Sequence, residues 1–185
     1  MKSRILFGLF VAVALAQLSL PASMIWRSER ALIGGQEFRF RTAPVDPYDA
    51  FRGRYVALRF DQNQAPVAAG RKIETGQKVY ALIEVGPDGF ARFSSVTDER
   101  PPDQSYLRVA VSSVQGTTAH LELPFDRFYM EETMAPAAEQ AYRQHSRRGQ
   151  QDAYVVVRVQ DGRGVIANLY VDGRPIAEFL RAQKP

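Results

Sequence analysis

Two aspartates in the stretch DPYDAFRG, Asp46 and Asp49, are the residues of this chain best placed to do chemistry. They stand three positions apart, so a helical turn would put both carboxylates on one face. One carboxyl group could then act as a general acid and the other as a general base. Such a pair works when a cleft holds the two pKa values apart. The spacing therefore allows a hydrolase or a carbohydrate-acting enzyme as one hypothesis.

The same stretch also has a purely structural interpretation, which we favour. Asp46 suits the N-cap of a short helix, and Asp49 would stabilise the positive end of its dipole. Gly53 can adopt the left-handed conformation that ends such a helix. Asp49 and Arg52, three positions apart, can pair across the turn. Because exposed turns commonly carry function, a turn that contacts a partner or ligand is a third interpretation.

Other reactive constellations are missing from the sequence. The chain has no cysteine, which excludes disulfides, thiol nucleophiles and cysteine-ligated metals. The two histidines, His120 and His145, do not stand at the spacing of the H-E-x-x-H zinc motif. The sequence also contains neither a G-x-S-x-G elbow nor a phosphate-binding glycine loop. We therefore expect neither a metal nor a cofactor.

The distribution of charge argues against a nucleic-acid partner. The net charge is +4, but residues 1–27 hold three basic residues and no acidic one. The remainder is almost neutral and lacks the basic footprint that phosphate backbones require. The aromatic run FDRFY at 125–129 could stack on single-stranded nucleic acid, but we interpret its rings as core residues. Arg39, Arg41 and Arg59 could face lipid headgroups or an acidic partner; we favour a solvated sheet face.

The N-terminal segment is apolar enough to enter a membrane. From Ile5 to Trp26 it has 22 residues without a charge, and about 20 apolar residues span the hydrocarbon core as a helix. Trp26 followed by Arg27 is typical of an interfacial anchor. A cleavable signal peptide ending at Ala14-Leu15-Ala16 is the alternative. The apolar residues continue past Ala16, so we favour a retained anchor.

The rest of the chain alternates in the manner of β-strands. In Glu37–Thr42, Phe38 and Phe40 share one face, as in a half-buried strand. Short turns between the segments favour antiparallel pairing, and hence a sandwich or small barrel. The further predicted strands are 54–60, 77–85, 90–96, 106–114, 118–123, 154–159 and 165–171.

One segment, 133–149, is predicted to be the only sizeable helix after the anchor, with Pro136 in its first turn and Gly149 as its stop. We divide the chain into a membrane anchor (1–27), a linker (28–36) and a β domain (37–181). The Gly34-Gly35 pair in the linker would break any helix that continues into it.

The stretch DPYDAFRGRYVALRF resembles the signature of the GDYXXLXY family, in which Asp46, Asp49, Arg52, Gly53 and Tyr55 occupy motif positions. Arg54 departs from the family's aspartate, and Phe60 from its tyrosine. The Arg127-Phe128-Tyr129 block and the 167–173 block are similar to later family blocks.

The resemblance implies a bacterial protein with an N-terminal membrane segment and a small exported domain. It also implies a neighbouring multi-span membrane protein as partner. We therefore expect a single-pass protein of the cytoplasmic (inner) membrane whose domain faces the periplasm or the cell exterior. The expected role is a non-enzymatic accessory or assembly domain that contacts lipid through its helix. The motif residues Asp46, Asp49, Arg52, Gly53, Tyr55, Arg127 and Tyr129 are the expected binding site, and a hydrolase using Asp46 and Asp49 is the alternative.

Overall fold

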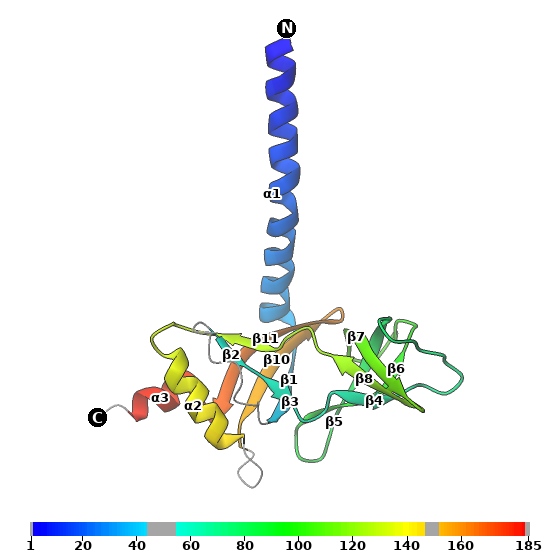
Figure 1. Cartoon of the computed structure of the whole chain (residues 1–185), viewed down its shortest axis with the longest axis vertical. Helices are drawn as coiled ribbons and strands as arrows, with labels where there is room; N and C mark the ends of the chain where they lie inside the picture. The colour runs from blue at the N-terminus through cyan, green and yellow to red at the C-terminus, as the bar shows by residue number, and fades with distance from the viewer. Residues whose placement is uncertain (1, 44–54, 147–151, 184–185) are drawn as a thin grey trace.

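The computed structural model describes residues 2–43, 55–146 and 152–183 of the chain. It is a mainly β domain from which one long helix projects (Figure 1). Two five-stranded sheets and a two-stranded ribbon make up the β structure, and every ladder between named strands is antiparallel. The predicted class, an N-terminal helix followed by an antiparallel β domain, is confirmed.

The projecting helix, α1, spans Lys2–Gly34 and contains a stretch long and apolar enough to cross a membrane. An 18-residue apolar window within that stretch has no buried residue. Two of its polar interruptions are satisfied locally, because the hydroxyls of Ser19 and Ser23 donate to backbone carbonyls three residues earlier, at 2.8 and 2.7 Å. Such bonds lower the cost of a hydroxyl in hydrocarbon.

The predicted linker 28–36 is mostly helical, which corrects the expectation of a linker directly after residue 27. Good helix formers continue the helix through this segment, and it stops where the Gly34-Gly35 pair predicts. Ala31 is fully buried against the domain, and the Arg158 guanidinium donates to the Gly35 carbonyl at 3.2 Å. The last turns of α1 are therefore seated on the domain.

The first sheet lies beneath α1 and has the order β12-β11-β10-β1-β3. Phe38 and Phe40 of β1 are buried, as their alternation predicts. Two Asp-Gly pairs make the tight turns at the ends of β11: Asp161 and Gly162, and Asp172 and Gly173, all have positive φ. The strands are β1 (Gln36–Ala43), β3 (Arg59–Phe60), β10 (Tyr154–Gln160), β11 (Arg163–Val171) and β12 (Arg174–Pro175).

The second sheet curls into a nearly closed barrel with the order β4-β8-β7-β5-β6. A bridge between Val67 and Val96 joins its two edges, and the Ala68 N–H donates to the Val96 carbonyl at 2.9 Å. The Arg108 N–H donates to the Gly162 carbonyl at 2.8 Å and connects the barrel to the first sheet. The strands are β4 (Gln64–Pro66), β5 (Lys78–Val85), β6 (Ala91–Thr97), β7 (Tyr106–Gln115) and β8 (Thr118–Glu122).

The remaining elements differ most from the sequence prediction. The predicted strand 54–60 is divided at Leu58 into β2 (Tyr55–Ala57), which joins the ribbon, and β3 of the first sheet. The other ribbon strand, β9 (Arg127–Tyr129), was not predicted as a strand, nor were the short β4 and β12.

Two helices follow the ribbon. α2 (Ala135–His145) lies inside the predicted helix 133–149, whose last residues fall outside the described part of the chain. The short helix α3 (Ile176–Ala182) was not predicted; it buries Ile176, Phe179 and Leu180.

Candidate functional site

The structure brings three of the seven expected site residues together. Tyr55 lies on β2, and Arg127 and Tyr129 lie on β9, so these residues from two distant blocks share one ribbon. We call them the ribbon cluster. The other four, Asp46, Asp49, Arg52 and Gly53, lie outside the described residues. The short helix, the Asp49–Arg52 pair and the hydrolase hypothesis therefore stay predictions.

The ribbon cluster is an aromatic pair with an arginine above it. Tyr55 and Tyr129 are register partners, and their ring centroids lie 5.6 Å apart at 57°. The Arg127 guanidinium lies 5.1 Å from the Tyr55 ring centroid, within cation–π range. A hydrogen bond with Tyr129, followed by the charge of Asp126, raises the pKa of Arg127. The cluster therefore presents a permanent cation beside two amphipathic rings.

The period of the β-strand explains why these side chains face outward. Val56 follows Tyr55 on β2, points inward and is fully buried. Its register partner Phe128 is partly buried in the core. The Leu58 N–H donates to the Asp126 carbonyl at 2.8 Å, which extends the ribbon pairing by one bond. Because side chains alternate between the two faces of a strand, the apolar face of the ribbon packs on the core and the opposite face points outward.

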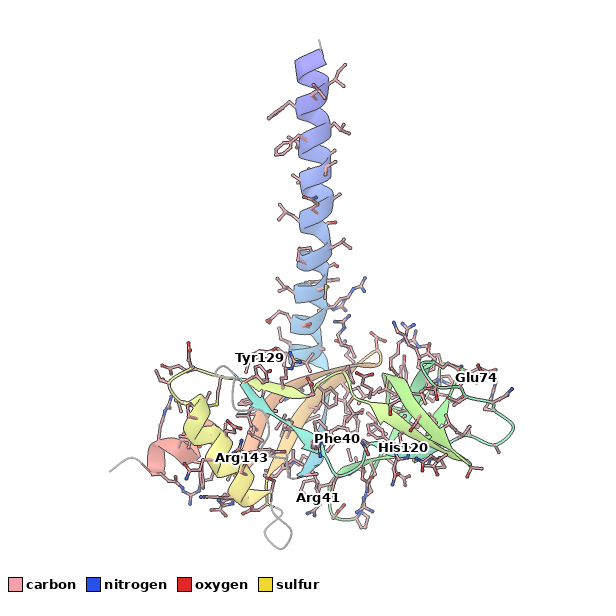
Figure 2. The ribbon with its side chains drawn as sticks, viewed as in Figure 1. Phe40, Arg41, Glu74, His120, Tyr129 and Arg143 are labelled. Atoms are coloured by element: carbon pink, nitrogen blue, oxygen red, sulfur yellow. The ribbon has the colours of Figure 1, made fainter. Side chains whose placement is uncertain are left out.

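Tyr129 is unusually exposed for an aromatic residue. It is 66% exposed, and Val85 is the other large apolar side chain exposed outside α1 in the described residues. The interpretation of 125–129 as core aromatics holds for Phe125 and is wrong for Tyr129. Tyr129 lies on the side of the domain from which α1 projects (Figure 2). A partner that contacts it would therefore approach from the direction of the helix.

Tyr142 of α2 hydrogen-bonds to residues on both sides of positions 44–54. Its hydroxyl donates to the Ala43 carbonyl at 2.8 Å and accepts from the Arg59 N–H at 3.4 Å. Ala43 ends β1 before residues 44–54, and Arg59 begins β3 after them. Burial raises the pKa of Tyr142, so the hydroxyl stays protonated and continues to donate. The helix α2 thereby ties the end of β1 to the start of β3.

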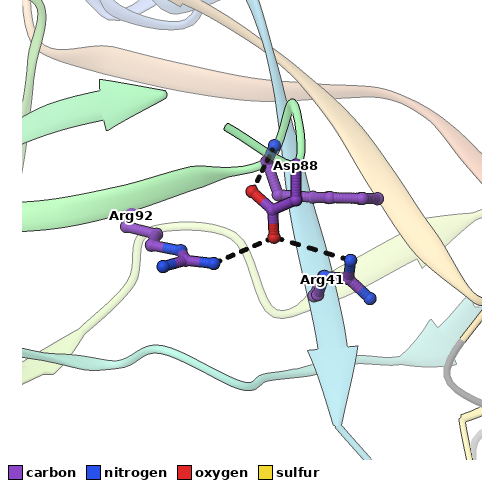
Figure 3. Close-up of polar contacts among 4 residues, drawn as sticks. Arg41, Asp88 and Arg92 are labelled. Carbon is purple, nitrogen blue, oxygen red and sulfur yellow. Dashed lines mark hydrogen bonds and ion pairs between the residues drawn. The ribbon is translucent and has the colours of Figure 1, made fainter. Parts of the chain in front are cut away.

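A second cluster lines a pocket of about 260 Å³ between the first sheet and the β5–β6 turn. One Asp88 oxygen lies 2.9 Å from an Arg92 nitrogen and 3.5 Å from an Arg41 nitrogen, and the other accepts from the Phe90 N–H at 3.3 Å (Figure 3). Arg41 also lies 4.1 Å from the Phe90 ring centroid. Nothing local in the sequence pairs Asp88 with Arg41, so this cluster was not identified from the sequence.

The electrostatics of this pocket fit a structural clamp. Partial desolvation opposes ionisation of Asp88, but the Phe90 N–H and the hydrogen bond and charge of Arg92 outweigh it, so the pKa of Asp88 is lowered. A carboxyl group held ionised is a poor general acid at neutral pH. Asp88 therefore ties the β5–β6 turn to β1.

The histidines take part in local contacts. His145 Nδ1 lies 2.9 Å from an Asp152 oxygen, and its ring packs edge-on against Phe179. Ser112 donates to the backbone carbonyl of His120 at 3.2 Å, so this bond leaves the imidazole ring uninvolved. Within the described residues, no group of three or more potential metal ligands comes together.

The arginines expected to form one face do not act as a unit. Arg39 and Arg59 are exposed, whereas Arg41 is half-buried and engaged with Asp88 and Phe90. Arg41 lies on the side of the domain opposite to α1 (Figure 2). It is therefore poorly placed to contact the membrane in which α1 would sit.

The sequence matches the family described as "GDYXXLXY protein" over residues 17–169. This range includes α1's second half, the ribbon cluster and both sheets except β12 and the end of β11. Comparisons with curated proteins and with solved structures found no match. The matched range covers most of the chain and contains the motif that leads into β2. The chain therefore belongs to the GDYXXLXY family.

Proposed function

We propose that this protein is a single-pass, membrane-anchored accessory domain whose ribbon cluster binds a multi-span membrane protein. The observation that carries the proposal is the assembly of Tyr55, Arg127 and Tyr129 on one exposed ribbon. Tyrosine and arginine are the residue types that most often dominate binding energy at interfaces.

The position of the ribbon cluster supports a partner in the membrane. Tyr129 lies on the side of the domain from which α1 projects, so a protein beside α1 in the bilayer would meet it. In the described part of the chain, β2 and β9 pair only with each other.

The test is site-specific photocrosslinking in native membranes. A photoreactive amino acid at Tyr129 is expected to crosslink to one integral membrane protein, and the same amino acid at Glu74 is not. Glu74 is a matched control, because its side chain is 73% exposed but belongs to the barrel side of the domain. Arg127→Ala in the Tyr129 probe should reduce the crosslink by about tenfold, the effect of losing one hot-spot residue.

The outcome against the proposal is equally definite. Equal crosslinking at Tyr129 and Glu74, or a Tyr129 crosslink that Arg127→Ala leaves unchanged, would show that the ribbon cluster is not the binding site. Thermal melting of the Arg127→Ala variant checks that the domain remains folded. Arg127 is exposed and its ion pair with Asp126 is weak at a surface, so its melting temperature should be close to wild type.

We further propose that the anchor lies in the cytoplasmic (inner) membrane with the domain on its periplasmic or outer side. Because the chain has no cysteine, an introduced cysteine is a unique reporter. In intact cells made permeable only at the outer surface, Glu74→Cys should react with a membrane-impermeant maleimide. Ser3→Cys, on the other side of the apolar segment, should react only after lysis. The reverse pattern would contradict the orientation.

A further inference from the structure

A groove beside the lower end of α1 is lined by arginines from three separate parts of the chain. Arg27 and Arg30 come from α1, Arg108 from β7, and Arg163 from the start of β11. We call this the juxtamembrane groove; its volume is about 740 Å³. That volume is within the range of small-molecule sites.

The groove is strongly basic. Asp161 is the acidic residue in its lining, and it is engaged at 3.2 Å by Arg100, which does not line the groove. Among the described residues, none of the four lining arginines forms an ion pair, since the salt bridges of this region belong to other side chains. Their guanidinium groups are therefore available to an anion. A guanidinium group can donate two parallel hydrogen bonds to two oxygens of one phosphate.

The groove lies at the depth of lipid headgroups when α1 spans a bilayer. The 22 uncharged residues Ile5–Trp26 cover about 33 Å at 1.5 Å per residue, close to the hydrocarbon thickness of about 30 Å. Trp26 then sits at the interface, where tryptophan is enriched. It also lines the groove, and the Arg30 guanidinium lies 4.8 Å from its ring centroid. The arginines therefore reach the phosphate layer.

We propose that the juxtamembrane groove binds the headgroup of an anionic phospholipid. The lipid's phosphate would sit among Arg27, Arg108 and Arg163, with its acyl chains running along the apolar surface of α1. This site is distinct from the ribbon cluster and rests only on the anchoring part of the proposed function. It also gives the domain a preferred orientation on the membrane, because the lipid contacts the helix and the domain together.

The chain carries its own probe, because Trp26 is its only tryptophan. The full chain is reconstituted in lipid nanodiscs that contain phosphatidylcholine with increasing fractions of brominated phosphatidylglycerol. Bound brominated lipid quenches Trp26 fluorescence on contact. Saturable quenching is expected at low fractions of the anionic lipid, with about tenfold weaker quenching by brominated phosphatidylcholine at equal fraction. A tenfold preference corresponds to about one or two basic residues acting at the membrane surface.

Variants assign the preference to the groove. The double variant Arg108→Gln with Arg163→Gln should reduce the selectivity for the anionic lipid about tenfold. The double variant Arg27→Gln with Arg163→Gln, which keeps Arg108, should reduce it to the same extent. The matched control is Arg174→Gln, an exposed arginine at the opposite end of β11 from Arg163. It should leave the quenching unchanged. Thermal melts confirm that each variant is folded.

Each other result would overturn the proposal. Equal quenching by the two brominated lipids, or selectivity that survives both groove variants, rules out a headgroup site in the groove. Full competition by soluble glycerol phosphate assigns the groove to a free phosphate compound instead of a lipid. A chain that fails to insert overturns the anchoring and the groove together, whereas insertion without selective quenching overturns the groove alone.

Discussion

At the scale of single residues, a few polar side chains connect segments that are far apart in the sequence. Tyr142 ties α2 to the ends of β1 and β3, and Asp88 ties the β5–β6 turn to Arg41 of β1. Thr42 is fully buried and donates to the Ala153 carbonyl at 2.8 Å. Each of these three side chains contacts or belongs to one of the last three residues of β1.

Tyr142→Phe is expected to destabilise the domain by about 0.5–1.5 kcal/mol, because it removes the hydrogen bond to the part-buried Ala43 carbonyl. Tyr142 is only 1% exposed, so water cannot replace the hydroxyl. Chemical denaturation of the two proteins measures the difference. The control is Tyr80→Phe, because the Tyr80 hydroxyl makes no hydrogen bond within the described residues. This substitution should lower the free energy of unfolding by less. Equal losses would contradict a specific role for Tyr142.

Asp88 should make stability depend on acid pH. Its folded pKa lies below its ordinary value of 3.8, so its contribution is complete above that pH and is lost as the pH falls through the folded pKa. Asp88→Asn should therefore lower the melting temperature at pH 7. In strong acid the difference in melting temperature between the variant and the wild type should become smaller. Asp103→Asn, an exposed aspartate, serves as control. A difference that stays constant with pH would contradict the clamp.

At the scale of elements, the same two-residue turn serves two different purposes in β11. The Asp172-Gly173 turn lies in open space, whereas the Asp161-Gly162 turn packs against the barrel and lines the juxtamembrane groove. Local backbone geometry is alike in both, with positive φ at each residue. The two turns differ only in what they pack against. Gly162 and Gly173 therefore allow the cost of the tertiary contact to be compared at the same backbone geometry.

Gly162→Ala is expected to cost more than Gly173→Ala. Both substitutions place a side chain at positive φ, which costs about 1–2 kcal/mol. At Gly162 the new Cβ would also lie 2.5 Å from a Tyr106 ring carbon, whereas no heavy atom lies within 4 Å at Gly173. Displacing the buried ring adds about 1–3 kcal/mol. Denaturant unfolding of both variants checks the order, and equal costs would show that the ring moves freely.

At the scale of the whole molecule, the domain is held against the base of its helix. Ala31 is buried, and the final turns of α1 lie against β10 and β11. The distance from Trp26 to the end of α1 at Gly34 is about 12 Å along the helix axis. A bilayer spanned by α1 would therefore have the domain, the ribbon cluster and the juxtamembrane groove close to its surface.

The purified protein is expected to retain this helix. Apolar residues continue past Ala16 to Trp26, and the helix extends unbroken to Gly34. Intact-mass analysis of the membrane fraction should therefore give the chain with residues 1–16 present, and alkaline carbonate should not extract it. A soluble chain that starts at Gln17 would identify a cleaved signal peptide and overturn the anchor.

The sequence by itself determined the features that depend on local pattern. Strand alternation at Phe38 and Phe40, the short turns between strands and the uncharged Ile5–Trp26 run each follow from a few neighbouring residues. The stop at Gly34-Gly35 was also predictable, but the continuation of the helix up to it was missed. The family resemblance added the motif residues that became the ribbon cluster, although it could not say that β9 pairs with β2.

Only the tertiary structure decided the features that depend on long-range pairing. The strand predicted at 54–60 divides because Val56 pairs with Phe128, whereas Phe60 pairs with Thr42 of a different sheet. The exposure of Tyr129 follows from the side of the ribbon that packs on the core. The juxtamembrane groove exists because α1 ends beside Arg108 and Arg163, which stand more than 70 residues further along the chain. No local pattern records these pairings, since packing of the whole chain selects them.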